Sequence, residues 1–196
     1  SGYVVRNLER IVRAAPAGAL VAIDGYHAFH ALPVDLSRIH ARAFYLAGGY
    51  KYAMAGEGAC FLAIPPGCEL RPADTGWYAA FDALAGAPGD VVPCSKDAFR
   101  FWGSTFDPSG LYRFNAVMDW LAGLGVTVGD IHAHAQRLES RFLAGLEALS
   151  LARLPAASLV PPAGVARGNF LAFDIDDAEA VHQRLLTVGI YIDRRD

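Results

Sequence analysis

The sequence predicts an α/β fold for the first half of the chain and an α+β lobe for the second half. Near the start, a helical pattern is followed by a continuous apolar run at residues 19–23, which is typical of a buried parallel strand with its crossover helix. Further apolar runs at residues 41–47 and 59–65 continue this sheet. From residue 107 onwards, amphipathic helical patterns and short strand-like runs replace it.

The composition predicts a folded protein. Of the 196 residues, 54% are hydrophobic and 19% are charged, which excludes wholesale disorder. Lys and Arg number 17 against 20 Asp and Glu, with no basic run, and the apolar runs are far shorter than a membrane span. We therefore expect neither nucleic acid nor a membrane as a partner.

The cysteines and the chain ends bear on the location of the protein. Three cysteines without a C-x-x-C pair favour a reducing compartment, and residues 1–13 lack the apolar core of a signal peptide. We therefore expect a cytoplasmic protein. The chain starts with Ser1-Gly2 and stops directly after a strand-like run, so we expect it to be cut at both ends.

The first half contains one helix and three strands in this interpretation. Leu8, Ile11 and Val12 recur at helical spacing, and residues 16–18 end that helix. A glycine-rich segment at residues 48–58 joins the second and third strands. Because it is too short for a crossover helix, these two strands are predicted to be antiparallel, which makes a mostly parallel sheet mixed.

The second half follows residues 68–92, whose Pro, Gly and Asp content predicts a connector. We therefore expect two domains, at residues 1–92 and 93–196. Asp107-Pro108 is a favourable start for the first helix of the second domain.

Further elements are expected towards the end of the chain. Asp130 opens a second long helix. Residues 170–175 predict a strand, residues 177–188 a helix, and residues 191–192 a closing strand.

Asp24 and Lys51 lie at positions where ligand binding or catalysis is expected. Asp24 follows the first apolar run, at the end of a strand where open α/β sheets bind ligands, and either caps the next turn or contacts a ligand. Lys51 follows two glycines and lies between Tyr50 and Tyr52. An apolar setting favours the neutral amine, a nucleophile that can form a Schiff base with an aldehyde. An ordinary exposed loop lysine is the alternative.

A metal site is a weaker interpretation of the same region. Asp24, His27 and His30 have the spacing of metal ligands on one helix face, but a strand precedes them and Pro33 follows closely, so a helix has little room. No G-x-S-x-G or G-x-G-x-x-G motif supports a serine nucleophile or a dinucleotide site.

Several motifs, taken together, resemble those of one enzyme family. Residues 21–36, V-A-I-D-G-Y-H-A-F-H-A-L-P-V-D-L, resemble the D-x-x-[HQ]-x-x-G-x-x-P-V-D-L segment of class V aminotransferases and kynureninases. Residues 48–58, G-G-Y-K-Y-A-M-A-G-E-G, resemble their cofactor-lysine loop in its G-Y-K-Y form. R-F-W-G-S-T at residues 100–105 resembles their R-F-x-x-G-T segment. Weaker matches at residues 75–78 and 189–195 follow in the family order.

The resemblance implies a fold and a cofactor. Members of this family are fold type I enzymes, similar to aspartate aminotransferase, and they use pyridoxal 5′-phosphate. The chain then corresponds to the rear part of the large, cofactor-binding domain at residues 1–92, with a mixed, mostly parallel sheet. Residues 93–196 correspond to a small α+β C-terminal domain, and both domains are truncated.

The resemblance also implies residue roles. Lys51 carries the cofactor as a Schiff base and then moves the α-proton of the substrate. Asp24 pairs with the pyridine nitrogen, and His27 lies near the ring and its phenolic oxygen. Tyr50 gives a hydroxyl to the cofactor phosphate. Thr105 reaches the phosphate bound in the neighbouring subunit, which implies a homodimer with shared active sites.

The sequence departs from the family pattern at two of these positions. His30 replaces the usual Gly, and Ser104 replaces the Gly of the G-T pair, although Thr105 is kept. The family's phosphate-binding turn and its ring-stacking aromatic lie upstream of Ser1, and its carboxylate-binding arginine lies beyond Asp196. We therefore expect this segment alone to fold poorly and to bind the cofactor weakly.

The expected function is that of a pyridoxal phosphate enzyme acting on amino acid and keto acid substrates, first of all a class V aminotransferase. A kynureninase-like hydrolase is the runner-up because of the G-Y-K-Y loop. A cysteine desulfurase-like lyase is less favoured, because its lysine normally follows His and no cysteine here lies in a persulfide loop. Racemase or lyase chemistry and a non-catalytic family fragment stay open as further alternatives.

Overall fold

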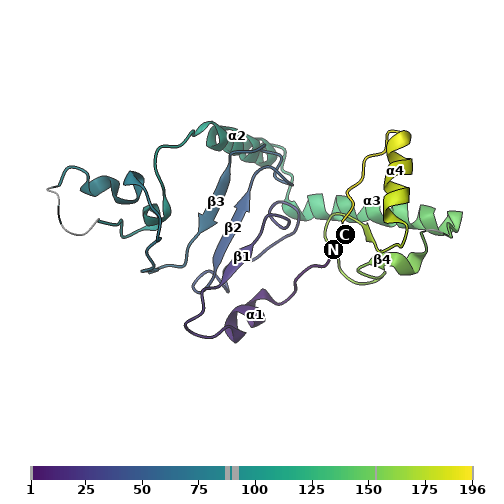
Figure 1. The fold of residues 1–196 in the computed structure, drawn as a ribbon, viewed down its shortest axis with the longest axis horizontal. Helices are drawn as coiled ribbons and strands as arrows, with labels where there is room; N and C mark the ends of the chain where they lie inside the picture. The colour runs from purple at the N-terminus through teal and green to yellow at the C-terminus, as the bar shows by residue number, and fades with distance from the viewer. Residues whose placement is uncertain (1, 87–88, 90–92, 153, 196) are drawn as a thin grey trace. The chain divides into compact units, whose positions relative to one another are not determined.

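The computed structural model describes residues 2–86, 89, 93–152 and 154–195 (Figure 1). Its contacts divide the chain into two compact units. The sheet unit comprises Asn7–Phe29 and Val34–Gly125, and the C-terminal unit comprises Ser1–Arg6, His30–Pro33 and Val126–Asp196. The predicted domain boundary at residues 92 and 93 touches residues 90–92, which lie outside the described residues, and it stays a prediction.

The sheet unit is built on three strands that lie side by side in the order β1-β2-β3 (Figure 1). The central strand β2, Phe44–Gly48, pairs in parallel with β1, Ala22–Asp24, and antiparallel with β3, Cys60–Ala63. The mixed sheet and its antiparallel pair are therefore confirmed. Strand β1 starts later than the apolar run because Ala19 N still bonds to Pro16 O (2.9 Å) in the preceding turn.

The first strand is not buried, which corrects the expectation for residues 19–23. Ala22 and Asp24 are exposed, whereas β2 is buried along most of its length. The difference follows from position, because β2 has a neighbour on each side and β1 is an edge strand among the described residues. An apolar run therefore identified the strand but not its burial.

The helix α1, Leu8–Ala14, covers the start of this sheet. Val12 from this helix is buried together with Ile39 and Ala43, and Ile23 of β1 packs against them. Of the three apolar residues at helical spacing, Leu8 and Val12 lie on the buried side of this short helix, whereas Ile11 is 49% exposed.

Residues 68–92 are more than a connector, because η1, Trp77–Ala83, lies within them and packs against η2, Ala98–Phe101. The aromatic side chains of both and of the following loop form one cluster of Trp77, Tyr78, Phe81, Phe99, Trp102 and Phe106. Gly76 permits this approach, since a Cβ there would lie 2.5 Å from the carbonyl carbon of Gly103. Contacts between distant aromatics leave no local periodicity, so the sequence predicted only a loop.

A long helix follows in each unit. The helix α2, Ser109–Gly123, starts after Asp107, whose Oδ1 accepts a hydrogen bond from Ser109 N (2.9 Å). The helix α3, Val128–Leu149, starts before the predicted Asp130, because Thr127 is its N-cap. Asp130 instead completes a capping box by accepting a hydrogen bond from Thr127 N (3.0 Å).

The C-terminal unit adds a small sheet and a short helix. The strand β4, Leu159–Val160, follows a 3-10 turn, η3, Ala156–Ser158, and pairs antiparallel with β5, Ala172–Phe173. The helix α4, Ala178–Thr187, agrees with the prediction for residues 177–188. Residues 191–192 form no strand, since they pair with neither β4 nor β5 and Tyr191 is 84% exposed.

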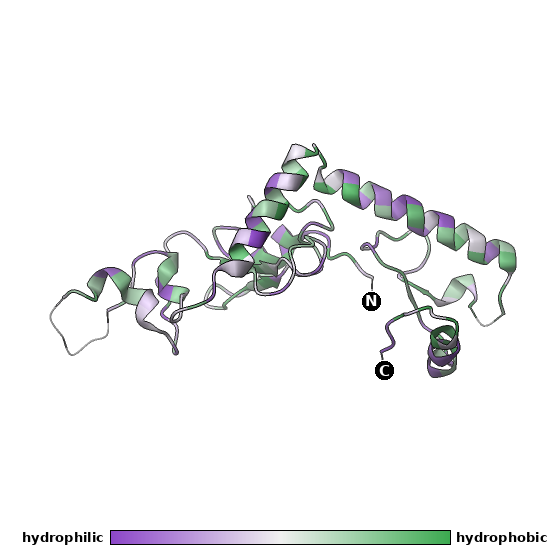
Figure 2. Ribbon diagram, turned by 90° about the horizontal axis from the view of Figure 1, so that it is seen from above, coloured by the Kyte–Doolittle hydropathy of each residue, from purple (hydrophilic) through white to green (hydrophobic). Residues whose placement is uncertain are grey.

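Hydrophobic and hydrophilic residues are interleaved along both α3 and α4 (Figure 2). No helix in the described part of the chain combines the length and the apolarity that crossing a membrane requires.

Candidate functional site

The loop between β2 and β3 carries Lys51 and has a closely packed backbone. At its base, Gly49 N donates a hydrogen bond to Ala59 O (2.8 Å), and Ala55 N donates one to Gly49 O (2.7 Å). Ala53 and Ala55 are 0% exposed. Lys51 therefore extends from a fixed backbone just after the carboxyl end of the central strand.

Three side chains surround the amine of Lys51. Its Nζ lies 2.6 Å from Nε2 of His27. It also lies 5.8 Å and 5.5 Å from the ring centroids of Tyr26 and Tyr50, within the range of cation–π attraction. The two tyrosine rings are 5.6 Å apart. The structure thus brings together three predicted site residues, Lys51, His27 and Tyr50, and adds Tyr26.

Asp24 lies at the end of β1, two residues before Tyr26. Its Oδ1 accepts a hydrogen bond from Tyr26 N (3.0 Å), so the carboxylate does cap the following turn. No other described residue bonds to this exposed carboxylate, which leaves Oδ2 open to a proton donor. Burial raises the pKa of the nearby Tyr45 phenol, and the charge of Asp24 raises it further.

Tyr26 is a member of this cluster that the sequence did not single out. Burial raises the pKa of its phenol, and the neighbouring Cys60 raises it further. Gly48 makes room for the ring, since a Cβ at Gly48 would lie 2.5 Å from Cε1 of Tyr26. The sequence feature that could have identified Tyr26 is its place inside the Asp24 motif, next to His27.

Thr105 lies outside this cluster. It is exposed in the loop between η2 and α2, and no contact among the described residues joins it to Lys51. The role predicted for it involves a neighbouring subunit, so it stays a prediction.

His30 occupies the motif position at which the resembling family has Gly. Its φ angle is 58°, in the left-handed region that glycine adopts without strain. His30 therefore adopts at this position a backbone conformation that favours glycine. Among the described residues, no group of three or more His, Cys, Asp or Glu side chains could hold a metal ion.

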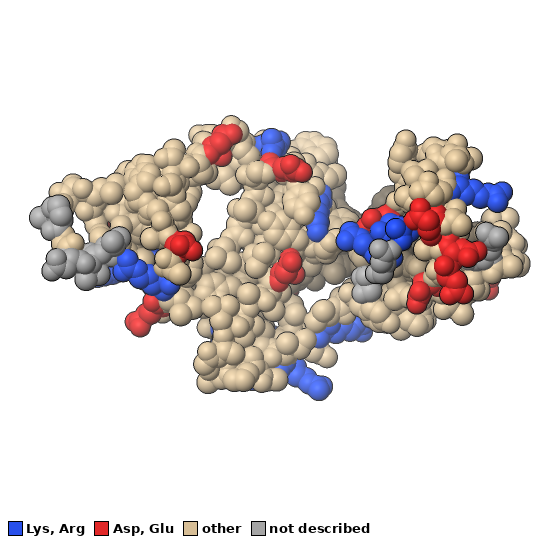
Figure 3. Space-filling view, viewed as in Figure 1, with Lys and Arg blue, Asp and Glu red and all other residues tan. Residues whose placement is uncertain are grey.

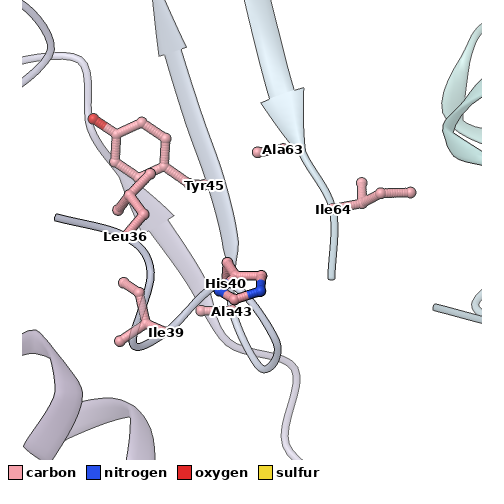
Figure 4. Close-up of a pocket in the computed structure, with 7 residues that line it drawn as sticks. All are labelled: Leu36, Ile39, His40, Ala43, Tyr45, Ala63 and Ile64. Atoms are coloured by element: carbon pink, nitrogen blue, oxygen red, sulfur yellow. The ribbon is translucent and has the colours of Figure 1, made fainter. Parts of the chain in front are cut away.

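A hollow lies beside the start of β2 and the end of β3 (Figure 4). Its lining consists of Leu36, Ile39, His40, Ala43, Tyr45, Ala63 and Ile64. The imidazole of His40 is bound through Nδ1 to the carbonyl oxygen of Ser37 (2.7 Å). Because this lining has no carboxylate, lysine or arginine, the Lys51 cluster is the better candidate for an active site.

Comparisons with known proteins identify the family of the chain. The family Aminotransferase class-V matches residues 1–184. Isopenicillin N epimerase from Streptomyces clavuligerus is 33% identical over 129 residues, which make up 62% of this chain and 29% of the epimerase.

A solved structure confirms the predicted fold. The apo structure of a cysteine desulfurase from Thermococcus onnurineus NA1 matches with a TM-score of 0.73 at 19% identity, over 94% of this chain. The chain spans 44% of that protein, less than half of its length. The match identifies the large-domain sheet as part of a fold type I architecture. With a family match over nearly the whole chain, the protein belongs to the class V aminotransferase family, whose members depend on pyridoxal 5′-phosphate.

Proposed function

We propose that this protein is an aminotransferase that moves an amino group between an amino acid and a keto acid. The observation that carries the proposal is the Lys51 amine, held by a close-packed loop and in contact with His27 at 2.6 Å. The family match supports the cofactor and an amino acid as the substrate class.

The side chains at the end of β1 and β2 fit pyridoxal phosphate. Lys51 is a primary amine next to an apolar pair of rings, and it is one of only two lysines in the sequence. The open carboxylate oxygen of Asp24 suits a protonated pyridine nitrogen. Tyr50 is 48% exposed, which leaves this side chain accessible to an incoming phosphate.

Each residue then has a distinct task. When bound, pyridoxal phosphate withdraws electrons from the substrate Cα and makes the α-proton acidic. The amine of Lys51 is the base that takes this proton from Cα and returns it. His27 bonds to the same amine and so orients it and exchanges a proton with it. Asp24 keeps the ring nitrogen protonated by charge complementarity.

The proposal extends to assembly and location. We expect a homodimer in which Thr105 of one subunit contacts the phosphate bound to its partner. The free thiols of Cys60, Cys68 and Cys94 support the expected cytoplasmic location.

The cofactor's absorbance tests this proposal directly. In the full-length protein, added pyridoxal phosphate should give the long-wavelength band of the lysine-bound form, and Lys51→Ala should abolish it. Lys96 is the other lysine and is exposed, so Lys96→Ala is the matched control and should keep the band. No band in the parent protein, or an unchanged band in Lys51→Ala, would refute the assignment.

An epimerase is the second candidate, because a relative that is 33% identical carries that name. Both reactions need the proton transfer by Lys51, and they differ in whether the amino group leaves the substrate. Incubation of a ¹⁵N-labelled L-amino acid with an unlabelled keto acid separates them. Transfer of ¹⁵N supports the aminotransferase, whereas inversion at Cα without transfer supports the epimerase.

A further inference from the structure

The helix α2 packs against the loop that carries Lys51, and Arg113 lies at this contact. Its Nε donates a hydrogen bond to the carbonyl oxygen of Ala55, and its Nη2 donates one to the carbonyl oxygen of Glu57. A charged donor makes these bonds stronger than neutral ones. One guanidinium thus fixes two carbonyls of the lysine loop, four and six residues beyond Lys51.

The loop backbone is shaped to receive this side chain. Gly56 lies between the two bonded carbonyls and has a φ of 70°, which a residue with a Cβ rarely adopts. A Cβ at Gly56 would lie 2.9 Å from Nε of Arg113. The guanidinium therefore lies directly against the backbone at this turn.

Two neighbours of Arg113 on the same face of α2 reinforce the contact. Gly110 lies so close to the carbonyl of Gly58 that a Cβ would overlap it. The ring of Phe114 lies against Gly49, where a Cβ would be 2.9 Å from its Cδ2. Contacts from α2 therefore reach both ends of the loop on either side of Lys51.

We propose that Arg113 is a positioning residue that determines where the amine of Lys51 lies. The inference rests on the proposed function, because it assigns Arg113 to the placement of the base of that reaction. Arg113 acts through the loop, since its bonds go to Ala55 and Glu57 and not to Lys51. Proton transfer is sensitive to displacements well below 1 Å, so a loosened loop misplaces the base.

The same bonds argue against a different role for this arginine. A substrate carboxylate is usually held by two parallel bonds from one edge of a guanidinium. In Arg113 the Nε–Nη2 edge is occupied by the two loop carbonyls, so that edge is not available for a carboxylate.

The test compares Arg113→Met and Arg113→Lys in the full-length protein, with Arg141→Met on the exposed side of α3 as the matched control. The first readout is amide hydrogen exchange in the cofactor-free protein. We expect exchange at residues 49–58 to become about tenfold to a hundredfold faster in Arg113→Met, with a smaller change in Arg113→Lys. The rest of the sheet should exchange as in the parent protein.

The second readout is the pH titration of the bound cofactor's absorbance, which a merely structural residue would not shift. We expect Arg113→Met to displace its midpoint and Arg113→Lys to restore it in part, while Arg141→Met leaves it unchanged. Unchanged exchange at residues 49–58 together with an unchanged midpoint would overturn the proposal. If Arg113→Met does not fold, Gly110→Ala, which pushes on Gly58, must give the same local loosening or the proposal fails.

The two proposals fail in different ways. A parent protein without a cofactor band refutes the proposed function but leaves the exchange measurement valid. A parent protein with the band, and an Arg113→Met variant identical to it in both readouts, refutes only the positioning role.

Discussion

The sheet unit and the C-terminal unit bury different kinds of groups. In the sheet unit the buried residues are mainly small and apolar, and Ala47, Ala53 and Ala55 are 0% exposed. The buried polar or charged residues in the described part of the chain are Ser158 and Arg167, both in the C-terminal unit. On the face seen in Figure 3, acidic and basic side chains gather over the C-terminal unit, and the sheet unit is mostly uncharged.

This difference shows how each unit achieves a defined structure. Close backbone approach at Ala and Gly places the loop of Lys51. The C-terminal unit instead uses hydrogen bonds donated by side chains: Gln136 Nε2 donates one to Glu139 Oε2 (3.1 Å) and one to the backbone oxygen of Gly168 (3.1 Å). The first kind of packing is sensitive to added volume, and the second is sensitive to protonation.

Replacing a glycine by alanine should give the largest change in the free energy of unfolding, and the change should have opposite signs in the two units. Gly48→Ala places a Cβ 2.5 Å from the Tyr26 ring, and we expect it to lower the free energy of unfolding by about 1–3 kcal/mol. In α3, the Cβ added by Gly145→Ala would meet no atom within 4 Å, and this substitution should raise the free energy of unfolding by about 0.5–1 kcal/mol. Urea unfolding of the full-length protein measures both. A neutral Gly48→Ala would show that the packing around Tyr26 is not tight.

A change of protonation should act in the C-terminal unit. Burial raises the pKa of Glu139, while Arg167, Gln136 and His132 lower it by smaller amounts. A raised pKa in the folded state means that stability is full below the ordinary pKa of the group and is lost as pH rises through the folded pKa. Glu139→Gln should therefore raise the unfolding temperature at pH 7 by a few degrees, with a smaller gain near pH 4.

The exposed Glu147 on the same helix provides the control for this change. At each pH in that range, Glu147→Gln should have nearly the same unfolding temperature as the parent protein. A loss of stability in Glu139→Gln at pH 7 would mean that the attraction to Arg167 outweighs the desolvation of the carboxylate.

The smallest change in stability is expected at residues whose backbone lies in the left-handed region. His30 has a φ of 58°, and His30→Gly should relieve about 1 kcal/mol of backbone strain, offset in part by the greater freedom of glycine in the unfolded chain. Ser150, with a φ of 48° at the end of α3, is the comparison, because Ser150→Gly removes similar strain without removing a half-buried ring.

A pH series separates the two contributions at His30. Burial lowers its pKa below the ordinary value of 6.5, so stability is full above that value and falls as pH drops below it. Thermal unfolding between pH 5 and 7 should show this loss in the parent protein and in Ser150→Gly, but a smaller one in His30→Gly. An equal loss in all three would assign the pH dependence to another group.

Much of the candidate-site region could be predicted from local sequence. The glycine-rich loop around Lys51 lies between two apolar runs, and its shortness indicated the antiparallel pair that the structure confirms. The spacing of Asp24 and His27 within one motif indicated residues near one strand end. Local patterns did not predict burial, which depends on the neighbours of each strand in the sheet. They wrongly predicted a strand at residues 191–192, which pair with neither β4 nor β5.

By itself, the sequence indicated the family motifs, the order of most elements and Lys51 as the candidate for the base, because periodicity, turn residues and a short lysine loop are all local features. Only the tertiary structure decided that Tyr26 flanks Lys51 and that Arg113 holds its loop. The bond from Arg113 to Ala55 joins residues 58 positions apart, and such a contact depends on how α2 packs. Local propensity sets where a helix begins and ends, but only packing sets what its side chains touch.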